Sequence, residues 1–197
     1  MKNILLLSIF ILTGFTVSAQ ETSQQQDRPD TLYYPAIAQE FSSTLQGILM
    51  AELKKGGTLG AVSVCSDTAL KLTGEIGNKY GVKIKRISDK NRNAKNAPAN
   101  EKEVMILQVL LEEHSLLSAE EKDEDAIKAL NIKKEKIKTP GLFFTPMKTA
   151  GACIQCHGNE DQIAPATLQK INELYPHDKA RGYKAGDFRG AIVIEKK

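Results

Sequence analysis

The chain has 197 residues, of which 27 are lysine or arginine and 24 are aspartate or glutamate, so its formal net charge is only +3. With 41% hydrophobic residues, it is long and apolar enough to form one domain with a sizeable core. The small, scattered positive charge argues against a nucleic-acid partner, because nucleic-acid-binding proteins concentrate lysine and arginine on one surface.

The N-terminal segment has the pattern of an export signal. Lys2 precedes an apolar run of about fourteen residues from Ile4 to Val17, which is shorter than the roughly 20 residues that span a bilayer. Val17 and Ala19 occupy the two positions where signal peptidase requires small residues. We therefore expect residues 1–19 to be removed, leaving a periplasmic or otherwise exported protein without a membrane anchor.

The segment that follows the export signal is predicted to be a disordered linker at residues 20–34. From Gln20 the chain is rich in Gln, Ser and Asp and contains Pro29, a composition that buries little apolar surface. The folded domain is therefore expected to span residues 35–197.

Two helices are predicted at the start of this domain. Apolar residues recur at helical spacing from Ile37 to Leu53, and the pair Gly56-Gly57 ends the helix. A second helix is predicted from Thr58 to Tyr80, before Gly81. Five of its residues share one buried face: Val62, Cys65, Ala69, Leu72 and Ile76.

Strands and further helices alternate in the rest of the domain. Strands are predicted at residues 82–88, 142–145 and 191–195. A turn-rich loop is predicted at 89–98, and helices at 101–114 and 165–175. Residues 115–138 are predicted to form a solvated helix or hairpin with one apolar edge. In the helix at 101–114, Val104, Leu107 and Leu111 are expected to face the core. Because long helices come first and loops separate the strands, the predicted fold class is α+β with an antiparallel sheet.

Cys153, Cys156 and His157 form a Cys-x-x-Cys-His motif. Two residues between the cysteines let both sulfurs form thioethers with the vinyl groups on one edge of a porphyrin, while His157 offers a neutral nitrogen to the iron. In an exported chain this motif predicts one covalently bound haem c. Attachment would take place outside the cytoplasm and would require the haem maturation machinery as a partner.

Three other kinds of site use similar residues. A thioredoxin-like dithiol needs a strand before the motif and a long helix after it, whereas residues 158–162 are a polar loop. A structural zinc site needs four convergent ligands, and His157 directly after Cys156 is poorly placed to share one ion with it. A plain disulfide leaves His157 without a role, so haem attachment is favoured over all three.

The sixth iron ligand is expected mainly from the chain before the motif, because residues 158–197 contain no methionine. Cys65 is favoured, since it is the remaining thiol, lies on an apolar helical face and belongs to a chain expected in an oxidising compartment. Its alternative role is that of a small buried hydrophobe. The other candidates are Met50, Met105, Met147 and His114, with His177 as the downstream option.

Arg92 and Arg189 are predicted to contact haem propionates. A planar guanidinium group binds a carboxylate through two parallel hydrogen bonds, so arginine suits this role better than lysine. The alternative for each residue is a surface arginine in contact with solvent.

Several short stretches together resemble one family. They are Ala61 to Cys65, Arg92-Asn93 with Asn96-Ala97-Pro98, Cys153 to Gly158, Leu174-Tyr175-Pro176, Gly182-Tyr183, Gly186-Asp187 and Arg189-Gly190-Ala191. Over roughly residues 37–195 the chain resembles the c-type haem domain with a PAS-like fold, first seen in a cyanobacterial protein of the Tll type. This domain is also found as the extracytoplasmic part of histidine kinases and chemotaxis-type receptors. The chain departs from the family pattern at Ala94, Ala99 and Glu101.

The resemblance implies a PAS-like antiparallel sheet flanked by long N-terminal helices, with His157 and Cys65 as the axial iron ligands. It also implies sensing of redox state or of a small ligand. No kinase or receptor part is recognisable in this chain, so a signal is expected to pass to a redox or signalling protein. Electron transfer is the alternative function. A haem peroxidase or a haem-free binding module is expected less, and no catalytic residue is assigned.

Overall fold

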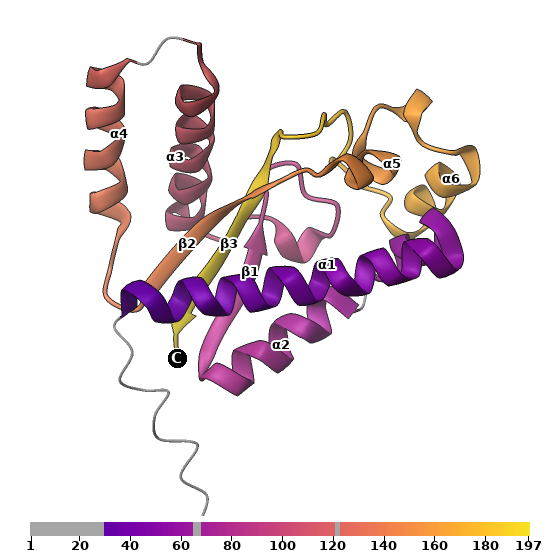
Figure 1. The fold of residues 1–197 in the computed structure, drawn as a ribbon, viewed down its shortest axis with the longest axis horizontal. Coiled ribbons are helices and arrows are strands. Elements are labelled where there is room, and N and C mark those ends of the chain that lie inside the picture. The colour runs from indigo at the N-terminus through magenta and orange to yellow at the C-terminus, as the bar shows by residue number, and fades with distance from the viewer. Residues whose placement is uncertain (1–29, 65–67, 121–122) are drawn as a thin grey trace, which may run out of the picture.

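The computed structural model of the protein describes residues 30–64, 68–120 and 123–197. The predicted signal peptide, residues 20–29 of the predicted linker and Cys65 lie outside the described residues. The described part is α+β, as predicted (Figure 1). Its helices are α1 (Asp30–Ser63), α2 (Ala69–Tyr80), α3 (Glu101–Ser118), α4 (Glu124–Ile137), α5 (Ile154–His157) and α6 (Pro165–Leu174). Its strands are β1 (Val82–Ile87), β2 (Leu142–Lys148) and β3 (Phe188–Lys196).

The three strands form one antiparallel sheet in the order β1-β3-β2. All three were predicted, but β2 continues beyond Thr145 and includes Pro146. Proline lacks the N–H group that a central strand must donate, and it is tolerated here because β2 is an edge strand. Gly190 lies so close to β1 that a Cβ atom would stand 2.2 Å from the carbonyl oxygen of Ile87, and its φ is 139°. Both constraints restrict this position to glycine.

Helices cover both faces of the sheet (Figure 1). The central strand β3 is buried on both sides, and its side chains alternate between two clusters. Ile192 and Ile194 pack with α1 and α2 through residues such as Phe41 and Leu72. Ala191 and Val193 pack with α3 and α4 in the other cluster.

The helix α1 begins before the predicted domain boundary and bends inside. It includes residues 30–34, which the sequence assigned to the linker, and Tyr34 is only 4% exposed because it packs against the sheet core. At Gly57 the backbone leaves the helical conformation, with φ 61° and ψ −158°. The predicted helix end at Gly56-Gly57 coincides with this kink, after which helical residues continue to Ser63 under the same label. Of the predicted helix 58–80, residues up to Ser63 belong to α1, and residues 69–80 form α2.

The helices α3 and α4 pack against each other as an antiparallel pair. The predicted core face of α3 was wrong at two positions, because Val104 is 40% and Leu111 is 46% exposed. The face that meets the sheet and α4 instead consists of Ile106, Leu107, Val109 and Leu110. In the described part of the chain, no helix is both long and apolar enough to cross a membrane.

The helix α6 begins at Pro165, as predicted, and packs against the second part of α1. Ile171 and Tyr175 form a small third core cluster with Val62 of α1. This cluster fixes the segment around the Cys-x-x-Cys-His motif next to the end of the sheet.

Candidate functional site

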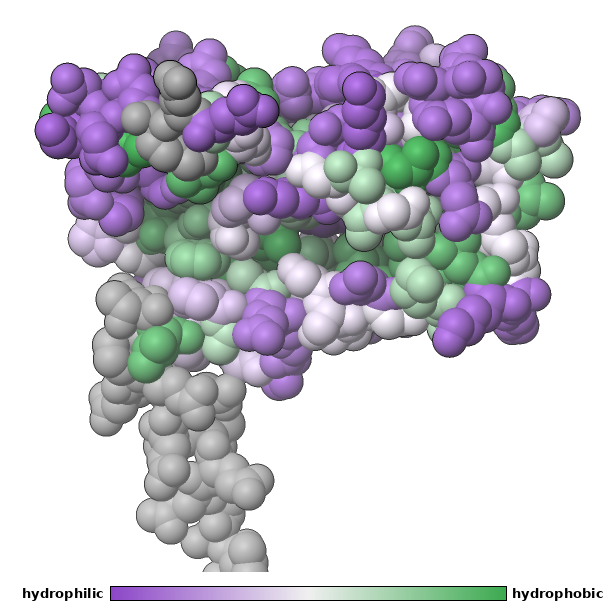
Figure 2. Space-filling model, turned by 45° about the horizontal axis from the view of Figure 1, so that its top comes forward, coloured by the Kyte–Doolittle hydropathy of each residue, from purple (hydrophilic) through white to green (hydrophobic). Residues whose placement is uncertain are grey.

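Three cavities meet at the end of the sheet where β1 and β2 end and β3 begins. Leu49 and Cys153 line all three, and His157 lines the two smaller ones, of about 150 and 60 Å³. The largest, of about 500 Å³, runs between α1 and β2. Figure 2 shows hydrophobic residues gathered in a hollow across the middle of one face, with hydrophilic residues along its rim. The three cavities together form an extended apolar groove that reaches Cys153.

The walls of this groove combine apolar side chains with cations. The apolar residues include Leu45, Leu49, Leu53, Ala61, Val62 and Met147. The cations are Arg86, Arg92, Lys148 and Arg189, and the described lining contains no aspartate or glutamate. Such walls are complementary to a large apolar ligand that carries negative charge on one side.

Cys153 ends a tight turn that begins at Gly151, and the rest of the motif forms the single turn of α5. Cys153 and Cys156 are half-buried, and the N–H group of Ala150 donates to the Cys153 sulfur at 3.3 Å. At Gly158, directly after the motif, a Cβ atom would lie 2.7 Å from the Ile154 side chain. The helix α5 therefore ends at Gly158, where only glycine fits. In the described residues after the motif, no long helix follows directly, as a thioredoxin-like site would require.

His157 is held in one tautomer by the backbone of a distant segment. Its Nδ1 lies 2.8 Å from the carbonyl oxygen of Ala180. A carbonyl oxygen only accepts hydrogen bonds, so Nδ1 carries the hydrogen and Nε2 keeps its lone pair. Burial, together with the positive charges of Arg92 and Arg189, lowers the pKa of His157 to about 3. The imidazole is therefore neutral at physiological pH and can coordinate a metal through Nε2.

The segment that supplies this carbonyl runs beside the motif. The N–H of Tyr183 donates to the His157 carbonyl and the N–H of Gly182 to the Gly158 carbonyl, both at 2.9 Å. The Tyr183 ring meets the imidazole edge to face, with 6.3 Å between the ring centroids. The backbone pairing and the ring contact fix the orientation of the His157 ring.

Arg92 is a buried link between the motif and this segment, with only 7% of its surface exposed. Its Nε and Nη2 donate to the two carboxylate oxygens of Asp178 at 3.2 and 3.1 Å, and Nη2 also donates to the Cys156 carbonyl at 2.6 Å. Burial raises the pKa of Asp178, but the hydrogen bonds and charge of Arg92 outweigh this effect and lower the pKa below its ordinary value. The guanidinium group is thus engaged by the protein itself, and the propionate contact of Arg92 stays a prediction.

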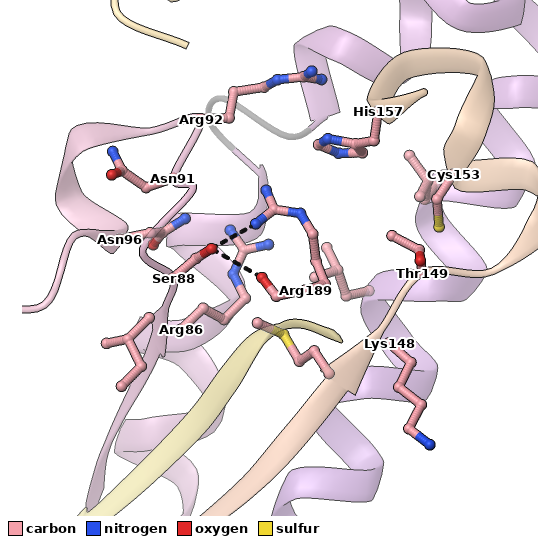
Figure 3. Close-up of a pocket in the computed structure, with 14 residues that line it drawn as sticks. Arg86, Ser88, Asn91, Arg92, Asn96, Lys148, Thr149, Cys153, His157 and Arg189 are labelled. Carbon is pink, nitrogen blue, oxygen red and sulfur yellow. Dashed lines mark hydrogen bonds between the residues drawn. The ribbon is translucent and has the colours of Figure 1, made fainter. Parts of the chain in front are cut away.

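Arg189 extends from the start of β3 into the cavity of about 150 Å³, which His157 also lines (Figure 3). Its Nη1 donates to the Ser88 hydroxyl at 2.8 Å and to the Lys90 carbonyl at 3.1 Å. Its Cζ lies 5.1 Å from the centre of the Tyr183 ring, and burial lowers the pKa of the guanidinium group. Among the described residues no carboxylate forms an ion pair with Arg189, so this cation is available to an anionic group of a ligand.

The residues predicted as a sixth ligand are spread over the molecule. Met147 lines the groove together with Cys153, at the end of β2. Cys65 lies outside the described residues, three positions after Val62, which lines the smallest cavity with His157. The other described candidates line none of the three cavities: Met50, Met105, His114 and His177.

Sequence reasoning missed two groups that orient His157, namely Asp178 and the Ala180 carbonyl. A backbone carbonyl has no sequence signature, because every residue carries one. Asp178 follows Pro176 in a segment typical of a turn, which predicts local geometry but not a salt bridge to Arg92, 86 positions earlier in the chain.

Comparisons with known proteins give one family match and one similar fold. The sequence model of the Tll0287-like family matches residues 10–196. The crystal structure of the cyanobacterial heme-protein Tll0287 superposes with a TM-score of 0.56 at 20% sequence identity, covering 85% of this chain and 95% of that one. This likeness shows a shared fold. A comparison with curated proteins gives no match. Because the family match extends over most of its length, the chain belongs to the Tll0287-like family.

Proposed function

We propose that this chain is an exported c-type haem protein that senses or buffers redox state, with one covalently attached haem. One observation carries the proposal: His157 keeps its Nε2 lone pair for a metal in a groove that is also lined by Cys153 and Cys156. Its membership of a family with a heme-protein member supports the same cofactor. Export is supported by the sequence pattern of residues 1–19.

The residues around the groove fit a haem in four respects. Cys153 and Cys156 would carry the thioether bonds, and His157 would coordinate the iron as a neutral ligand. Arg189, which lacks a carboxylate partner among the described residues, would bind a propionate. The apolar wall would keep water away from the ring. A bound haem supplies one-electron redox chemistry at its iron.

Cys65 is proposed as the second axial ligand, with His157 on the opposite side. The resemblance to the haem domain family points to this cysteine, and its position in the chain is compatible. It follows Val62 by three residues, which limits its distance from that cavity residue to about 11 Å, at roughly 3.6 Å per extended residue. Thiolate ligation would lower the reduction potential, and loss of the thiolate on reduction would give a sensor two distinct states.

A PAS-like sensor fold is part of this proposal. The chain would then report the redox state of its haem to a separate redox or signalling protein. Electron transfer is the second candidate function. It is favoured by the backbone pairing and buried ion pair that hold His157 in place, because a carrier benefits from ligands that do not move between oxidation states.

The test of the proposed function is expression with a cytochrome c maturation system. We expect the denatured protein to retain the mass of one haem and to stain for haem on a denaturing gel. The Cys153→Ser/Cys156→Ser double variant should lose this covalent mass, whereas a Met50→Leu variant, altered outside the groove, should retain it. Haem that is extracted from the wild type by acidified acetone would contradict covalent attachment.

A further inference from the structure

We propose that Arg92 and Asp178 form a buried pair that controls, through the Ala180 carbonyl, how strongly His157 donates electrons to a bound iron. The inference deepens the proposed function and rests on it, because it concerns the ligand side of the haem. Neither residue would touch the haem iron, so both are positioning residues that act through His157.

The guanidinium group of Arg92 donates hydrogen bonds to two backbone carbonyl groups, those of Cys156 and Ala180. Arg92 Nη2 donates to Cys156 O at 2.6 Å and to Ala180 O at 3.3 Å, in addition to Asp178 Oδ2 at 3.1 Å. The first carbonyl belongs to the motif, and the second accepts the Nδ1 hydrogen of His157. One side chain therefore contacts both the residue before His157 and the carbonyl group that accepts from its imidazole.

Because the Arg92–Asp178 ion pair is buried, its contribution to stability alone does not explain its presence. The side chains of Arg92 and Asp178 are 5% and 1% exposed. Removing two charges from water costs several kcal/mol in general, and apolar residues of similar size stabilise a core at least as well. A charged pair at this position, next to an iron-ligand candidate, is better explained by the field and the hydrogen bonds that it supplies.

Asp178 fixes the direction of the controlling carbonyl. Its Oδ1 accepts the N–H of Ala180 at 2.9 Å, and its Oδ2 accepts from Arg181 Nε at 3.0 Å. The carboxylate thus holds residues 178–181 in a turn that aims the Ala180 carbonyl at His157. Its negative charge also compensates the charge of Arg92 in the same buried space.

The two residues should shift the reduction potential in opposite directions. A cation that donates to the Ala180 carbonyl withdraws electron density from it, which weakens the carbonyl as an acceptor for His157 and makes the imidazole a poorer electron donor. A nearby positive charge also favours the reduced iron. Removal of Arg92 should therefore stabilise the ferric state, and neutralisation of Asp178 should stabilise the ferrous state.

The experiment compares haem-loaded Arg92→Gln and Asp178→Asn with the wild type by spectroelectrochemical titration. At a fixed potential, the ferrous-to-ferric ratio should fall about tenfold in Arg92→Gln, which corresponds to about 59 mV for one electron. The ratio should rise in Asp178→Asn. Arg181→Gln is the matched control, because Arg181 binds the same carboxylate but neither carbonyl, and its ratio should change by less than about threefold.

The sign of the two shifts decides between control of His157 and a merely structural role. If the variants only loosened the site and admitted water, both ratios would move in the same direction, and this result would overturn the inference, as would the absence of any shift. Should Arg92→Gln fail to fold, Arg92→Lys replaces it. A lysine keeps the charge but has fewer donors, so the ratio should fall by a smaller factor, and a rise would contradict the inference.

Haem staining of the denatured wild type distinguishes failure of the inference about Arg92 and Asp178 from failure of the proposed function. Stained wild type with no opposite shifts means that haem binds and that the Arg92–Asp178 pair does not control it. Unstained wild type means that the proposed function is wrong, and the inference about the pair falls with it.

Discussion

Thr58 and Thr167 share a hydrogen bond of 2.5 Å between their hydroxyl groups, although 109 positions separate them in the chain. Thr58 directly follows the bend of α1 at Gly57, and Thr167 lies in the first turn of α6, where it is 1% exposed. The bond ties the second part of α1, which contributes Ala61 and Val62 to the groove, to the helix that follows the motif. It thus holds the part of α1 that lines the groove against the helix that follows the motif.

Thr167→Val should lower the free energy of unfolding by about 1 kcal/mol. The substitution keeps the shape of the side chain but removes the hydroxyl, so that Thr58 loses its partner in a partly buried place. Urea unfolding of the purified protein measures the change. Thr167→Ser retains the hydroxyl and should lose less stability than Thr167→Val, and equal losses would show that the hydrogen bond contributes nothing.

The haem-free protein should become less stable as the pH falls below about 6.5. In the folded protein the pKa of His157 is lowered to about 3, from the ordinary value of 6.5 that it has when unfolded. Between these two values the unfolded chain binds the extra proton, so the stability contribution of this residue is complete above pH 6.5 and is lost as the pH falls towards 3. The slope is at most about 1.4 kcal/mol per pH unit for one proton.

The measurement uses the Cys153→Ser/Cys156→Ser background, in which no haem competes with the proton. Urea unfolding at pH 7 and pH 5 should show a larger loss of stability in this background than in the same background with His157→Gln. The two proteins differ only at position 157, so the difference in their pH dependence reports His157. Identical pH dependence in the two proteins would mean that His157 is not shielded from protonation.

Arg189→Gln should lower the thermal midpoint of the haem-loaded protein but not that of the haem-free protein. Without haem, Arg189 is a cation with no carboxylate partner among the described residues, and burial already lowers its pKa. Its neutralisation should then leave the thermal midpoint unchanged or raise it. With haem, the same substitution removes a propionate partner and should lower the midpoint. A decrease in both forms would assign Arg189 a purely structural role through Ser88 and Lys90.

The sequence predicted the elements of this fold more reliably than their ends and faces. The three strands and the start of α6 at Pro165 were predicted because their signals are local, namely strand-forming runs and proline at a first helical turn. The core face of α3 was not, because its sequence is apolar on several sides and only the packing of α4 and the sheet decides which side is buried. Val104 and Leu111 are exposed for this reason.

At the candidate site, too, the features set by neighbouring residues could be predicted from the sequence, whereas the contacts between distant segments could not. The spacing of Cys153, Cys156 and His157 is a local pattern, and the structure places all three beside the groove. The contacts that orient His157 come from residues 178–183 and from Arg92, and they depend on how distant segments meet. Sequence reasoning selected Arg92 for its chemistry as a carboxylate ligand, and the carboxylate that it binds in the structure is Asp178.

Protein recovered from the periplasm should begin at Gln20 or a neighbouring residue. Val17 and Ala19 fit the cleavage rule, and a processed chain can receive haem outside the cytoplasm. N-terminal sequencing of the periplasmic fraction tests this expectation, and Ala19→Arg should cause unprocessed precursor to accumulate. Protein that stays in the membrane fraction with residues 1–19 attached would contradict it.

Cys65→Ala should convert the ferric protein from a low-spin to a high-spin form. Cys65 is the thiol that remains once Cys153 and Cys156 are assigned to thioether bonds, and the family resemblance independently points to it as the partner of His157. Coordination to ferric iron would remove the thiol proton, and the resulting thiolate would stabilise the ferric state. Low-temperature electron paramagnetic resonance and optical spectra of the wild type and the variant measure the change.

The Met147→Leu variant is the matched control, because Met147 is the other sulfur-containing candidate that lines the groove. It should keep the low-spin ferric spectrum of the wild type. An unchanged low-spin spectrum in Cys65→Ala, combined with a high-spin spectrum in Met147→Leu, would transfer the ligand assignment to Met147. A reductive titration under carbon monoxide then separates the two functions. If the ferrous wild type binds carbon monoxide readily, its sixth ligand leaves on reduction, as a sensor requires. A ferrous protein that excludes carbon monoxide keeps both ligands, and that result would favour electron transfer instead.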